Sequence, residues 1–410
     1  MFPPSPTSLH ERRPDICRLP LPDADVPAAT LNGTLAGPAY PPGTGSSLIQ
    51  TSTIQHVTFS GNRSITIPDQ GLAVSDPLNF HIAPQSELAI SIYLQNGQAS
   101  NYITGHPGSR VNSWYGTGNQ INAKNITGAD AVTQQHWWFI EALETWAPAE
   151  ASSFVIIGDS ITDGRGSWNN GNNRWPDNVL AAMQNTSATS NIAVINQGAG
   201  GNRVLTDGNG PNALSRVERD VIAQPGTRFA MIFEGVSCLM LERRGEKGML
   251  THSQVNDIGT GDLTEYNATV VYQRLTQAYK QMVTRMHTFN IPGKPSLPPL
   301  STPTILTASS VFGATITPFG APNSTIQAYS KPLYLALRDR VNEFIRNSGT
   351  FDAVIDFDEW LRDPSNHSML NPIYNSGDYL HPNEAGYQVI GERFPLELFT
   401  EWAGGVNTFT

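Results

Sequence analysis

The chain has 410 residues, more than one hydrophobic core ordinarily supports, and this length suits two domains of unequal size. A net charge of −10 without a basic cluster argues against a nucleic-acid partner, and no apolar run is long enough for a membrane span. Only two cysteines are present, so we expect no disulfide framework.

Residues 1–45 are rich in proline and show no hydrophobic periodicity, so we expect this segment to be disordered. It also lacks the apolar core of a secretory signal peptide. Seven N-x-S/T sequons nevertheless favour a secreted glycoprotein, at Asn32, Asn62, Asn125, Asn185, Asn267, Asn323 and Asn366. A misassigned first exon would explain the missing signal peptide.

Residues 46–150 are predicted to form a small antiparallel β-sandwich that acts as an accessory domain. Short segments with period-two alternation, such as ELAISIYLQNG (87–97), are separated by Gly, Pro and Asn. The segment HWWFIEALETW (136–146) is predicted to be the last strand. Its Trp137 and Trp138 can stack on sugar rings, although packing in a core or between domains is the more common role.

Residues 151–410 are predicted to form an α/β domain. Five apolar, β-branched runs read as buried strands: 154–158, 192–196, 229–233, 303–308 and 352–357. Helical patterns lie between or after them, near 174–184, 266–286, 332–346 and 385–402. This alternation predicts a parallel sheet covered by helices on both faces. Ligands of such sheets bind beyond the carboxyl ends of the strands, so we expect chemistry in the loops that follow them.

Two of these loops contain glycines beside groups that suit acyl transfer. In IIGDSITDGRG, Ser160 directly follows the first strand, where a neighbouring base would make it a nucleophile; a helix-capping serine is the alternative. The second strand ends in NQGAGGNRV, which is not a dinucleotide loop because Arg203 replaces the third glycine. Its glycines can instead turn a backbone N–H toward a developing oxyanion.

A third loop, SGDYLHPNEAGY, contains Asp378 and His381 three residues apart. A single turn at this spacing lets the carboxylate reach Nδ1 of the imidazole and leaves Nε2 free to act as a base. An isolated D-x-x-H pair is usually structural. Here the pair follows the last strand of the sheet whose first strand presents Ser160, which favours a Ser–His–Asp arrangement.

The motifs GDSITDG, NxGxxGN, a GVND-like loop and DxxHPN, in this order, resemble those of the SGNH (GDSL) hydrolase family. The resemblance covers roughly residues 153–402 and points to the extracellular branch with a β-rich N-terminal extension, which includes xylan-esterase-like members. HPGSR (106–110) and FGATITPFG (312–320) also resemble that branch. The family implies a flavodoxin-like three-layer fold with a five-stranded parallel sheet, and ester hydrolysis without a metal or other cofactor.

The resemblance also implies roles for individual residues. It matches Ser160 to the nucleophile, His381 to the general base and Asp378 to the residue that orients the base. Asp159 matches an aspartate that is more often structural than catalytic. The oxyanion-hole donors implied by the family are Ser160, Gly201 and Asn256.

One segment departs from the family pattern. Nineteen residues, 237–255 or equally 236–254, separate a valine from Asn256 where family loops run straight through GVND. The segment is charged and contains Cys238. We hypothesise a retained intron of 57 nucleotides, since Val236-Ser237 can be encoded GTGAGT, Leu250-Thr251 CTGAC and Gln254 CAG. A genuine surface loop is the alternative.

The leading interpretation is a secreted serine ester hydrolase that deacetylates carbohydrate or small ester substrates. A lipase or general carboxylesterase is its nearest rival. A glycan-binding protein with an inactive hydrolase domain is the alternative from another class. The expected partner is a small-molecule or polysaccharide ester, and the sequence gives no indication of the oligomeric state.

Overall fold

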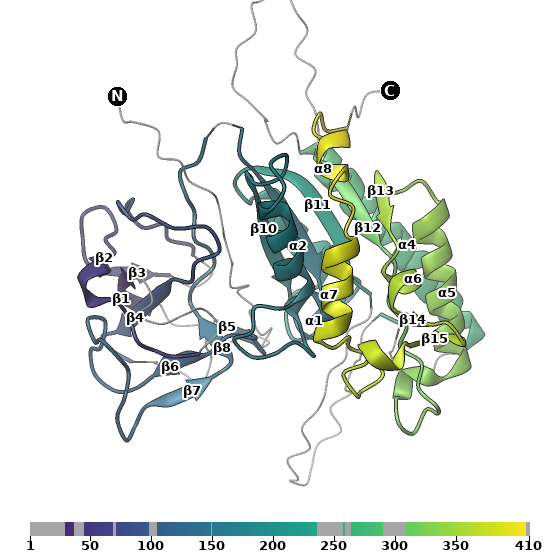
Figure 1. Ribbon diagram of the computed structural model, residues 1–410, viewed down its shortest axis with the longest axis horizontal. Coiled ribbons are helices and arrows are strands. Elements are labelled where there is room, and N and C mark those ends of the chain that lie inside the picture. Colours follow the sequence, from purple (N-terminus) through teal and green to yellow (C-terminus); the bar gives the residue numbers. More distant parts are fainter. Residues whose placement is uncertain are drawn as a thin grey trace, which may run out of the picture.

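The computed structural model describes residues 29–36, 45–68, 71–97, 105–148, 150–235, 257–258, 264–289 and 309–406. Within these ranges an N-terminal β region lies beside a C-terminal α/β domain (Figure 1). The suspected intron 237–255, the oxyanion candidate Asn256 and the predicted strand 303–308 lie outside the described residues. None of the helices within them has the length and apolarity needed to cross a lipid bilayer.

The β region is built on a four-stranded antiparallel sheet with β1 (Ala29–Ala36) in its middle. Strand β4 (Ala89–Leu94) pairs with one edge of β1, while β2 (Gln55–His56) and β3 (Ile65–Ile67) pair with the other. The expectation of disorder throughout residues 1–45 is therefore wrong for β1. The nearest prolines, Pro27 and Pro38, flank the strand and so remove no N–H group from its ladders.

Two short antiparallel ribbons complete the β region. One pairs β5 (Gly105–Pro107) with β8 (His136–Trp138), and the other pairs β6 (Ser113–Tyr115) with β7 (Val132–Gln134). The predicted last strand, 136–146, is thus only three residues long. Its tryptophans pack inside the β region: Trp137 stacks on His106 at 4.9 Å between ring centroids, and Trp138 meets Tyr115 edge-on at 5.6 Å. These contacts favour the packing role over sugar stacking.

The α/β domain contains a five-stranded parallel sheet with the strand order β10-β9-β11-β12-β13. The strands are β9 (Ser152–Gly158), β10 (Ile192–Gly198), β11 (Thr227–Phe233), β12 (Ser310–Ala314) and β13 (Ala353–Ile355). This is the doubly wound, flavodoxin-like order, so the predicted fold class is confirmed. The fourth place in the sheet belongs to β12, a strand that the apolar pattern did not predict.

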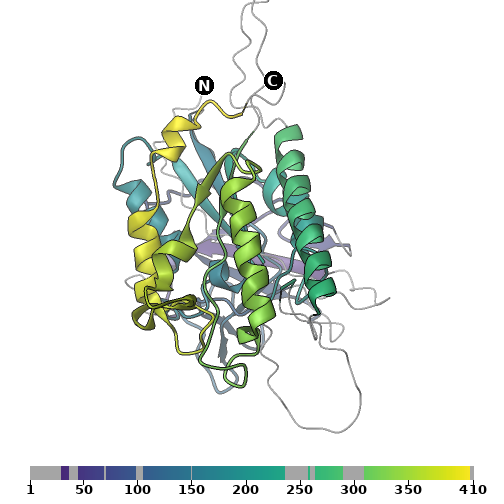
Figure 2. The same cartoon turned by 90° about the vertical axis from the view of Figure 1, so that its right-hand side faces the viewer.

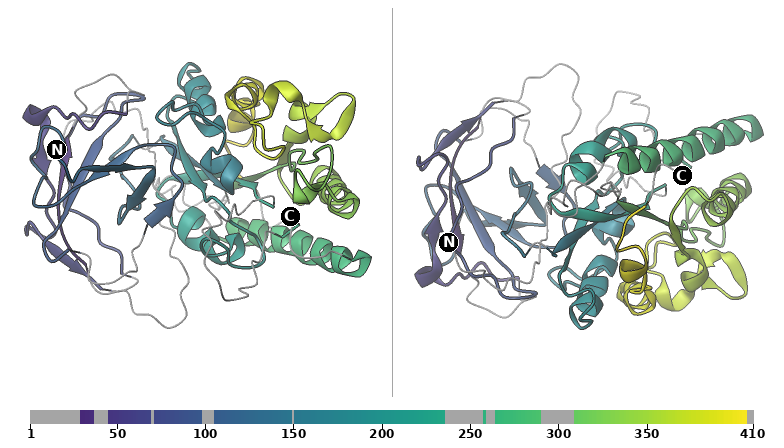
Figure 3. Two further views of the ribbon diagram at one scale, coloured as in Figure 1. Left: turned by 90° about the horizontal axis from the view of Figure 1, so that it is seen from below. Right: turned by 90° about the horizontal axis from the view of Figure 1, so that it is seen from above.

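Helices cover both faces of this sheet because its strands are apolar on both sides (Figures 2 and 3). In β9, Val155 and Ile157 face one layer, and Phe154 and Ile156 face the other; all four side chains are buried. The first layer contains α3 (Ala213–Val217), α4 (Glu265–Thr288) and α5 (Pro332–Asn347). The second contains α2 (Trp175–Gln184), α6 (Phe357–Leu361), α7 (Glu384–Arg393) and α8 (Leu398–Glu401).

The remaining elements are short. They are the 3₁₀ helices η1 (Thr51–Thr53), η3 (Ala328–Ser330) and η4 (Pro372–Tyr374), the π-helix η2 (Glu218–Ile222), the helix α1 (Ser160–Asp163), and the strands β14 (Arg362–Asp363) and β15 (Asn366–Leu370). The single helix predicted over 385–402 is wrong, because α7 ends at Arg393 and α8 is separate. Pro395 explains the break, since a proline disfavours helical backbone in the preceding residue, and Phe394 is extended (φ −61°, ψ 125°).

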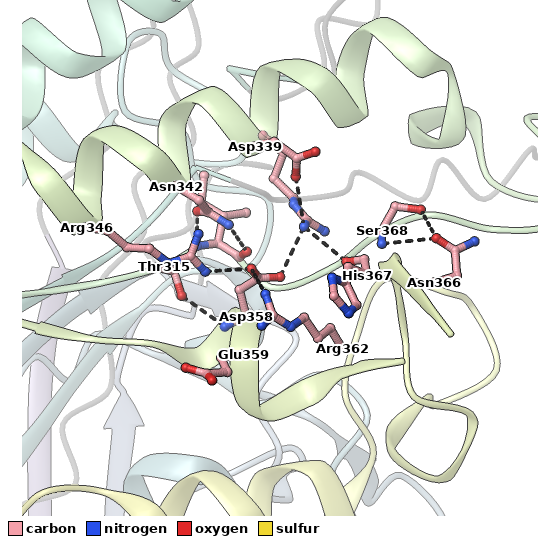
Figure 4. A network of polar contacts seen from close by, with 12 residues as sticks. Thr315, Asp339, Asn342, Arg346, Asp358, Glu359, Arg362, Asn366, His367 and Ser368 are labelled. Atoms are coloured by element: carbon pink, nitrogen blue, oxygen red, sulfur yellow. Dashed lines mark hydrogen bonds and ion pairs between the residues drawn. The ribbon is translucent and has the colours of Figure 1, made fainter. Parts of the chain in front are cut away.

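A polar network joins α5 to α6 and to the loop after β12 (Figure 4). Arg346 donates to Asp358 Oδ2 at 2.7 Å, and the Asp358 N–H donates to Thr315 Oγ1 at 2.9 Å. Asn342 bonds both backbone groups of Ile316, at 2.7 and 2.8 Å. These contacts satisfy polar groups that would otherwise be buried alone, which indicates a structural role.

Candidate active site

Ser160 lies where β9 ends and α1 begins, at the carboxyl edge of the sheet. The N-cap of α1 is Asp159, whose side chain accepts a hydrogen bond from the Ile161 N–H at 3.0 Å. The capping role considered for Ser160 therefore belongs to its neighbour, and the hydroxyl of Ser160 is available for another partner. Ser160 itself is buried.

The partner of the Ser160 hydroxyl is His381, 221 residues away in sequence. Ser160 Oγ lies 2.8 Å from His381 Nε2, and His381 Nδ1 lies 2.6 Å from Asp378 Oδ2. An ionised carboxylate only accepts hydrogen bonds, so Nδ1 carries the proton and Nε2 accepts from the serine hydroxyl. The structure thus brings three sequence-predicted site residues into one chain of hydrogen bonds.

The loop around Asp378 fixes the carboxylate before any substrate binds. Asp378 Oδ1 accepts from the N–H groups of Leu380 and His381, at 3.0 and 2.9 Å. Between Asp378 and Leu380, Tyr379 has a φ of +60°, in the left-handed region that residues other than glycine rarely adopt. The Tyr379 N–H donates to Asn375 Oδ1 at 3.0 Å, and this hydrogen bond stabilises the strained conformation.

Burial and neighbouring charges set the protonation states of this pair. Burial acts to raise the pKa of Asp378, but hydrogen bonds and the charge of His381 outweigh it, so the pKa falls below its usual range. Burial lowers the pKa of His381; Asp378 opposes this shift, and the charges of Arg165 and Arg110 add to it. The imidazole is therefore neutral at neutral pH and can accept a proton.

The loop after β10 presents Gly201 with a φ of +78°, a conformation that favours glycine. A Cβ at this position would lie 2.6 Å from Asn209 Nδ2, so a side chain would have to displace the Asn209 amide. In the part of the chain that the structure describes, the backbone N–H groups of Ser160 and Gly201 donate to no acceptor. Asn256, the third predicted donor, lies outside the described residues.

The residue after Asn256 is described and well anchored. Asp257 accepts hydrogen bonds from the N–H groups of Val204 and Leu205, at 2.5 and 2.8 Å. Burial raises the pKa of Asp257 to about 6, although these two N–H groups act to lower it. The chain beyond the suspected intron is thus fixed to the loop that contains Gly201.

A loop of the β region also reaches this edge of the sheet, which the sequence analysis did not predict. His106 Nε2 donates to the carbonyl of Gly198, at the end of β10, at 3.2 Å. The Asn170 N–H donates to the carbonyl of Arg110 at 2.7 Å, which joins the HPGSR loop to the loop after α1. The only sequence signal was the similarity of HPGSR to the family branch, and it gave no indication of contact partners.

The loop after α1 is in turn packed against the segment that contains His381. Gly166 has a φ of +96°, and a Cβ there would lie 2.1 Å from the carbonyl oxygen of Pro382. The Tyr387 hydroxyl on α7 donates to the carbonyl of Arg165 at 2.5 Å. Segments from three parts of the chain therefore meet around Ser160.

Beneath the site, the buried side chain of Arg216 was also missed by sequence reasoning. Its guanidinium donates to the carbonyls of Gly158 and Gln197, at 3.0 and 2.8 Å, and to Asp220 Oδ2 at 2.9 Å. Gly158 and Gln197 lie at or next to the carboxyl ends of β9 and β10. Arg216 therefore holds together the two strand ends that position Ser160 and Gly201.

Comparison with solved structures identifies several similar proteins. One is a member of the lipolytic protein G-D-S-L family from Veillonella parvula (21% identity, 61% of this chain and 99% of that chain covered, TM-score 0.38). Others are an acetyl xylan esterase from Geobacillus stearothermophilus (18%, 63% and 98%, 0.38) and a carbohydrate acetylesterase family member from Sinorhizobium meliloti (12%, 62% and 99%, 0.39). A search of curated proteins gave no match.

The profile of the GDSL-like lipase/acylhydrolase family matches residues 156–389, from within β9 to α7. The match spans more than half of the chain and includes the segments that carry Ser160, Gly201, Asp378 and His381. The β region lies outside the matched residues. The chain therefore belongs to the GDSL-like lipase/acylhydrolase family and is a carboxylic ester hydrolase.

Proposed function

We propose that this enzyme cleaves its ester substrates through a covalent acyl-enzyme formed on Ser160. The observation that carries the proposal is the continuous hydrogen-bond chain from Ser160 Oγ to His381, 2.8 Å, and from His381 to Asp378, 2.6 Å. A serine hydroxyl is a weak nucleophile unless a base takes its proton, and a neutral imidazole within hydrogen-bond distance is such a base.

In the first step, Ser160 Oγ attacks the ester carbonyl while His381 Nε2 takes the hydroxyl proton. The imidazolium that forms is stabilised by the Asp378 carboxylate at Nδ1. His381 then returns the proton to the leaving alcohol as the tetrahedral intermediate collapses to the acyl-enzyme. Water repeats the sequence on the acyl group and regenerates the serine.

The negative charge of the tetrahedral intermediate needs hydrogen-bond donors in fixed positions. We assign this role to the backbone N–H groups of Ser160 and Gly201, and to the side-chain amide of Asn256. The absence of a protein acceptor for the first two N–H groups among the described residues supports the assignment. Loss of one such donor typically lowers the rate by roughly 10²–10³.

For the substrate, we propose acetyl or other small acyl esters of carbohydrates, in line with the motif resemblance to xylan-esterase-like proteins. We also propose that the protein is secreted and glycosylated, and that residues 46–150, extended to include β1, form an accessory domain to the hydrolase domain 151–410. Expression of the gene with its native first exon in a eukaryotic host tests secretion and glycosylation. Secreted protein that shifts in mass on deglycosylation supports both, and unmodified intracellular protein argues against them.

The enzymatic proposal is tested with a fluorophosphonate probe and p-nitrophenyl acetate. The native protein should be labelled and should hydrolyse the ester, and Ser160→Ala should lose both properties. Acetyl-xylan and p-nitrophenyl palmitate then compare the proposed substrate class with a lipase substrate. Higher kcat/KM for the palmitate would favour the lipase alternative, whereas labelling that persists in Ser160→Ala would refute the role of Ser160.

A further inference from the structure

Asp163 is a buried carboxyl group next to the nucleophile that the proposed mechanism does not use. It lies three residues after Ser160 in α1, and side chains at this spacing share one face of a helical turn. It is only 5% exposed. Its carboxyl oxygens accept no hydrogen bond from the described residues, and His106 Nε2, 3.8 Å from Oδ1, is too far away to donate one.

Two glycines lie beside this carboxyl group. Oδ2 lies 3.3 Å from the position that a Cβ on Gly200 would occupy, and 3.8 Å from the corresponding position on Gly108. Gly200 immediately precedes Gly201, one of the two proposed backbone donors of the oxyanion hole. The carboxyl group of Asp163 is therefore close to the place where the ester group of a substrate would bind.

Arg110 is a cation that lies near the carboxyl group of Asp163. It follows Gly108 by two residues in the HPGSR loop, which His106 and the Asn170 N–H fix to the α/β domain. Its guanidinium makes no hydrogen bond or ion pair with the described residues, and its Nε is fully buried. Gly108, two residues before Arg110, lies beside Asp163 Oδ2. Burial lowers the pKa of Arg110 and the charge of Asp163 opposes this shift, in agreement with that proximity.

Burial of such groups without partners is unfavourable, and more so for charged groups than for neutral ones. Burial raises the pKa of Asp163 to about 8, against the opposing charges of Arg174 and Arg110, which reflects the same penalty. Native proteins leave few buried polar groups unsatisfied, and each one that remains calls for an explanation, such as a catalytic role or a bound water or ion. A carboxyl group and a guanidinium beside the nucleophile therefore indicate a ligand with polar groups of its own.

We propose that Asp163 and Arg110 form a subsite that binds a hydroxyl group of the substrate alcohol, adjacent to the ester. The preferred substrates would then be monoesters of polyols, such as partly acetylated sugars. This inference rests on the proposed esterase function and specifies its substrate class.

The chemistry of the pair selects a hydroxyl over other groups. A hydroxyl donates to the Asp163 carboxyl and accepts from the Arg110 guanidinium, so it satisfies both residues at once. A cationic substituent would be repelled by the Arg110 guanidinium. An alkyl group would leave both residues without a partner.

Two esters that differ by one hydroxyl group test the proposal: trans-2-hydroxycyclohexyl acetate and cyclohexyl acetate. We expect the full-length enzyme to prefer the hydroxylated ester by at least about tenfold in kcat/KM, as one charge-assisted hydrogen bond allows. In Arg110→Met and Asp163→Ala this ratio should fall toward one, with Arg110→Lys in between. Because the ratio compares two substrates on one protein, a general loss of folded or active enzyme does not alter it.

The matched control is Lys124→Met, which removes a cation from the β region outside the proposed subsite and should leave the ratio unchanged. Fluorophosphonate labelling measures the active fraction of each variant, and Arg110→Lys keeps the test decisive if the other variants do not fold. A wild-type ratio near one, or a ratio unaffected by all three substitutions, would overturn the subsite while leaving the esterase function intact. If the native enzyme hydrolyses neither ester and is not labelled, the proposed function fails and the subsite fails with it.

Discussion

Replacing Asp378 by asparagine tests whether the hydrogen-bond chain at Ser160 acts as a catalytic unit. The substitution keeps the size of the side chain and one carbonyl oxygen, which can still accept from the N–H groups of Leu380 and His381. It removes the negative charge that lies 2.6 Å from His381 Nδ1. The loop should therefore fold as before, while the electrostatic support of the imidazole is lost.

The size of the effect follows from the geometry. The charge of an imidazolium spreads over its ring, so its effective distance from the carboxylate is about 3–4 Å, and at an effective dielectric constant of about 20 their attraction is about 4–5 kcal/mol. The Asp378 side chain is 30% exposed, so solvent weakens this attraction. A remaining contribution of about 3–4 kcal/mol corresponds to a loss of roughly 10²–10³ in kcat.

The asparagine amide adds a second effect. Its NH₂ group can donate to Nδ1, which places the imidazole proton on Nε2, where it blocks proton transfer from Ser160. The two effects together should lower kcat by about 10⁴ and change KM little.

The assay is steady-state hydrolysis of p-nitrophenyl acetate, with thermal unfolding as the check on folding. Asp363→Asn is the matched control, because the Asp363 carboxylate also accepts hydrogen bonds within a turn, from Ser365 at 2.7 and 2.8 Å. This variant should retain the wild-type kcat. An Asp378→Asn enzyme with kcat within tenfold of wild type would refute the reasoning, since the carboxylate would then contribute little to the transition state.

Three further predictions concern the base, the oxyanion hole and the suspected intron. The kcat/KM of the enzyme should rise with pH as His381 loses its proton, with a midpoint below about 6.5 because burial lowers that pKa; a midpoint above 7 would contradict this. Gly201→Ala should lower kcat by about 10²–10³, because the strained backbone and the contact with Asn209 would move the Gly201 N–H away from the oxyanion. Gly349→Ala, also at positive φ (+64°) but with no atom near the added Cβ, should lose only stability; equal kcat values for the two variants would contradict the expected displacement of the donor. A chain without residues 237–255 should fold and hydrolyse p-nitrophenyl acetate at least as fast as the full chain, because the hydrogen bonds of Asp257 do not involve those residues. Inactivity of that chain, or a mature transcript that keeps the 57 nucleotides, would refute the intron hypothesis.

The parallel sheet could be predicted wherever burial on both faces leaves a continuous apolar run in the sequence. Strands β9, β10, β11 and β13 all overlap such runs. Strand β12 does not, because its sequence SVFGA combines small residues with two larger ones. A Cβ on Gly313 would lie 2.5 Å from the ring of Phe351, so a side chain from another part of the chain fills the space that a strand residue usually occupies. A pattern read along one segment does not contain that information.

The proposed catalytic residues could be predicted from the sequence because local geometry and sheet topology fix their positions. Asp378 and His381 are joined by a single turn, so their spacing alone predicts that the carboxylate can reach Nδ1. Ser160 and Gly201 follow the ends of neighbouring parallel strands, so the strand order places them at the same edge. Where local geometry or sheet topology fixes a contact, the sequence is enough to predict it.

The proximity of Asp163 and Arg110 could not be predicted in this way. Each stands in a motif that was noticed, GDSITDG and HPGSR, but no periodicity or spacing connects two loops more than fifty residues apart. Their proximity depends on the hydrogen bond from His106 to Gly198, and hence on how the β region packs against the sheet. On the subsite proposal, this packing contact supplies part of the substrate-binding wall. The β region is then a functional part of the enzyme, because removing it would remove Arg110. The enzyme would lose one of the two groups that distinguish a hydroxylated alcohol from a plain one.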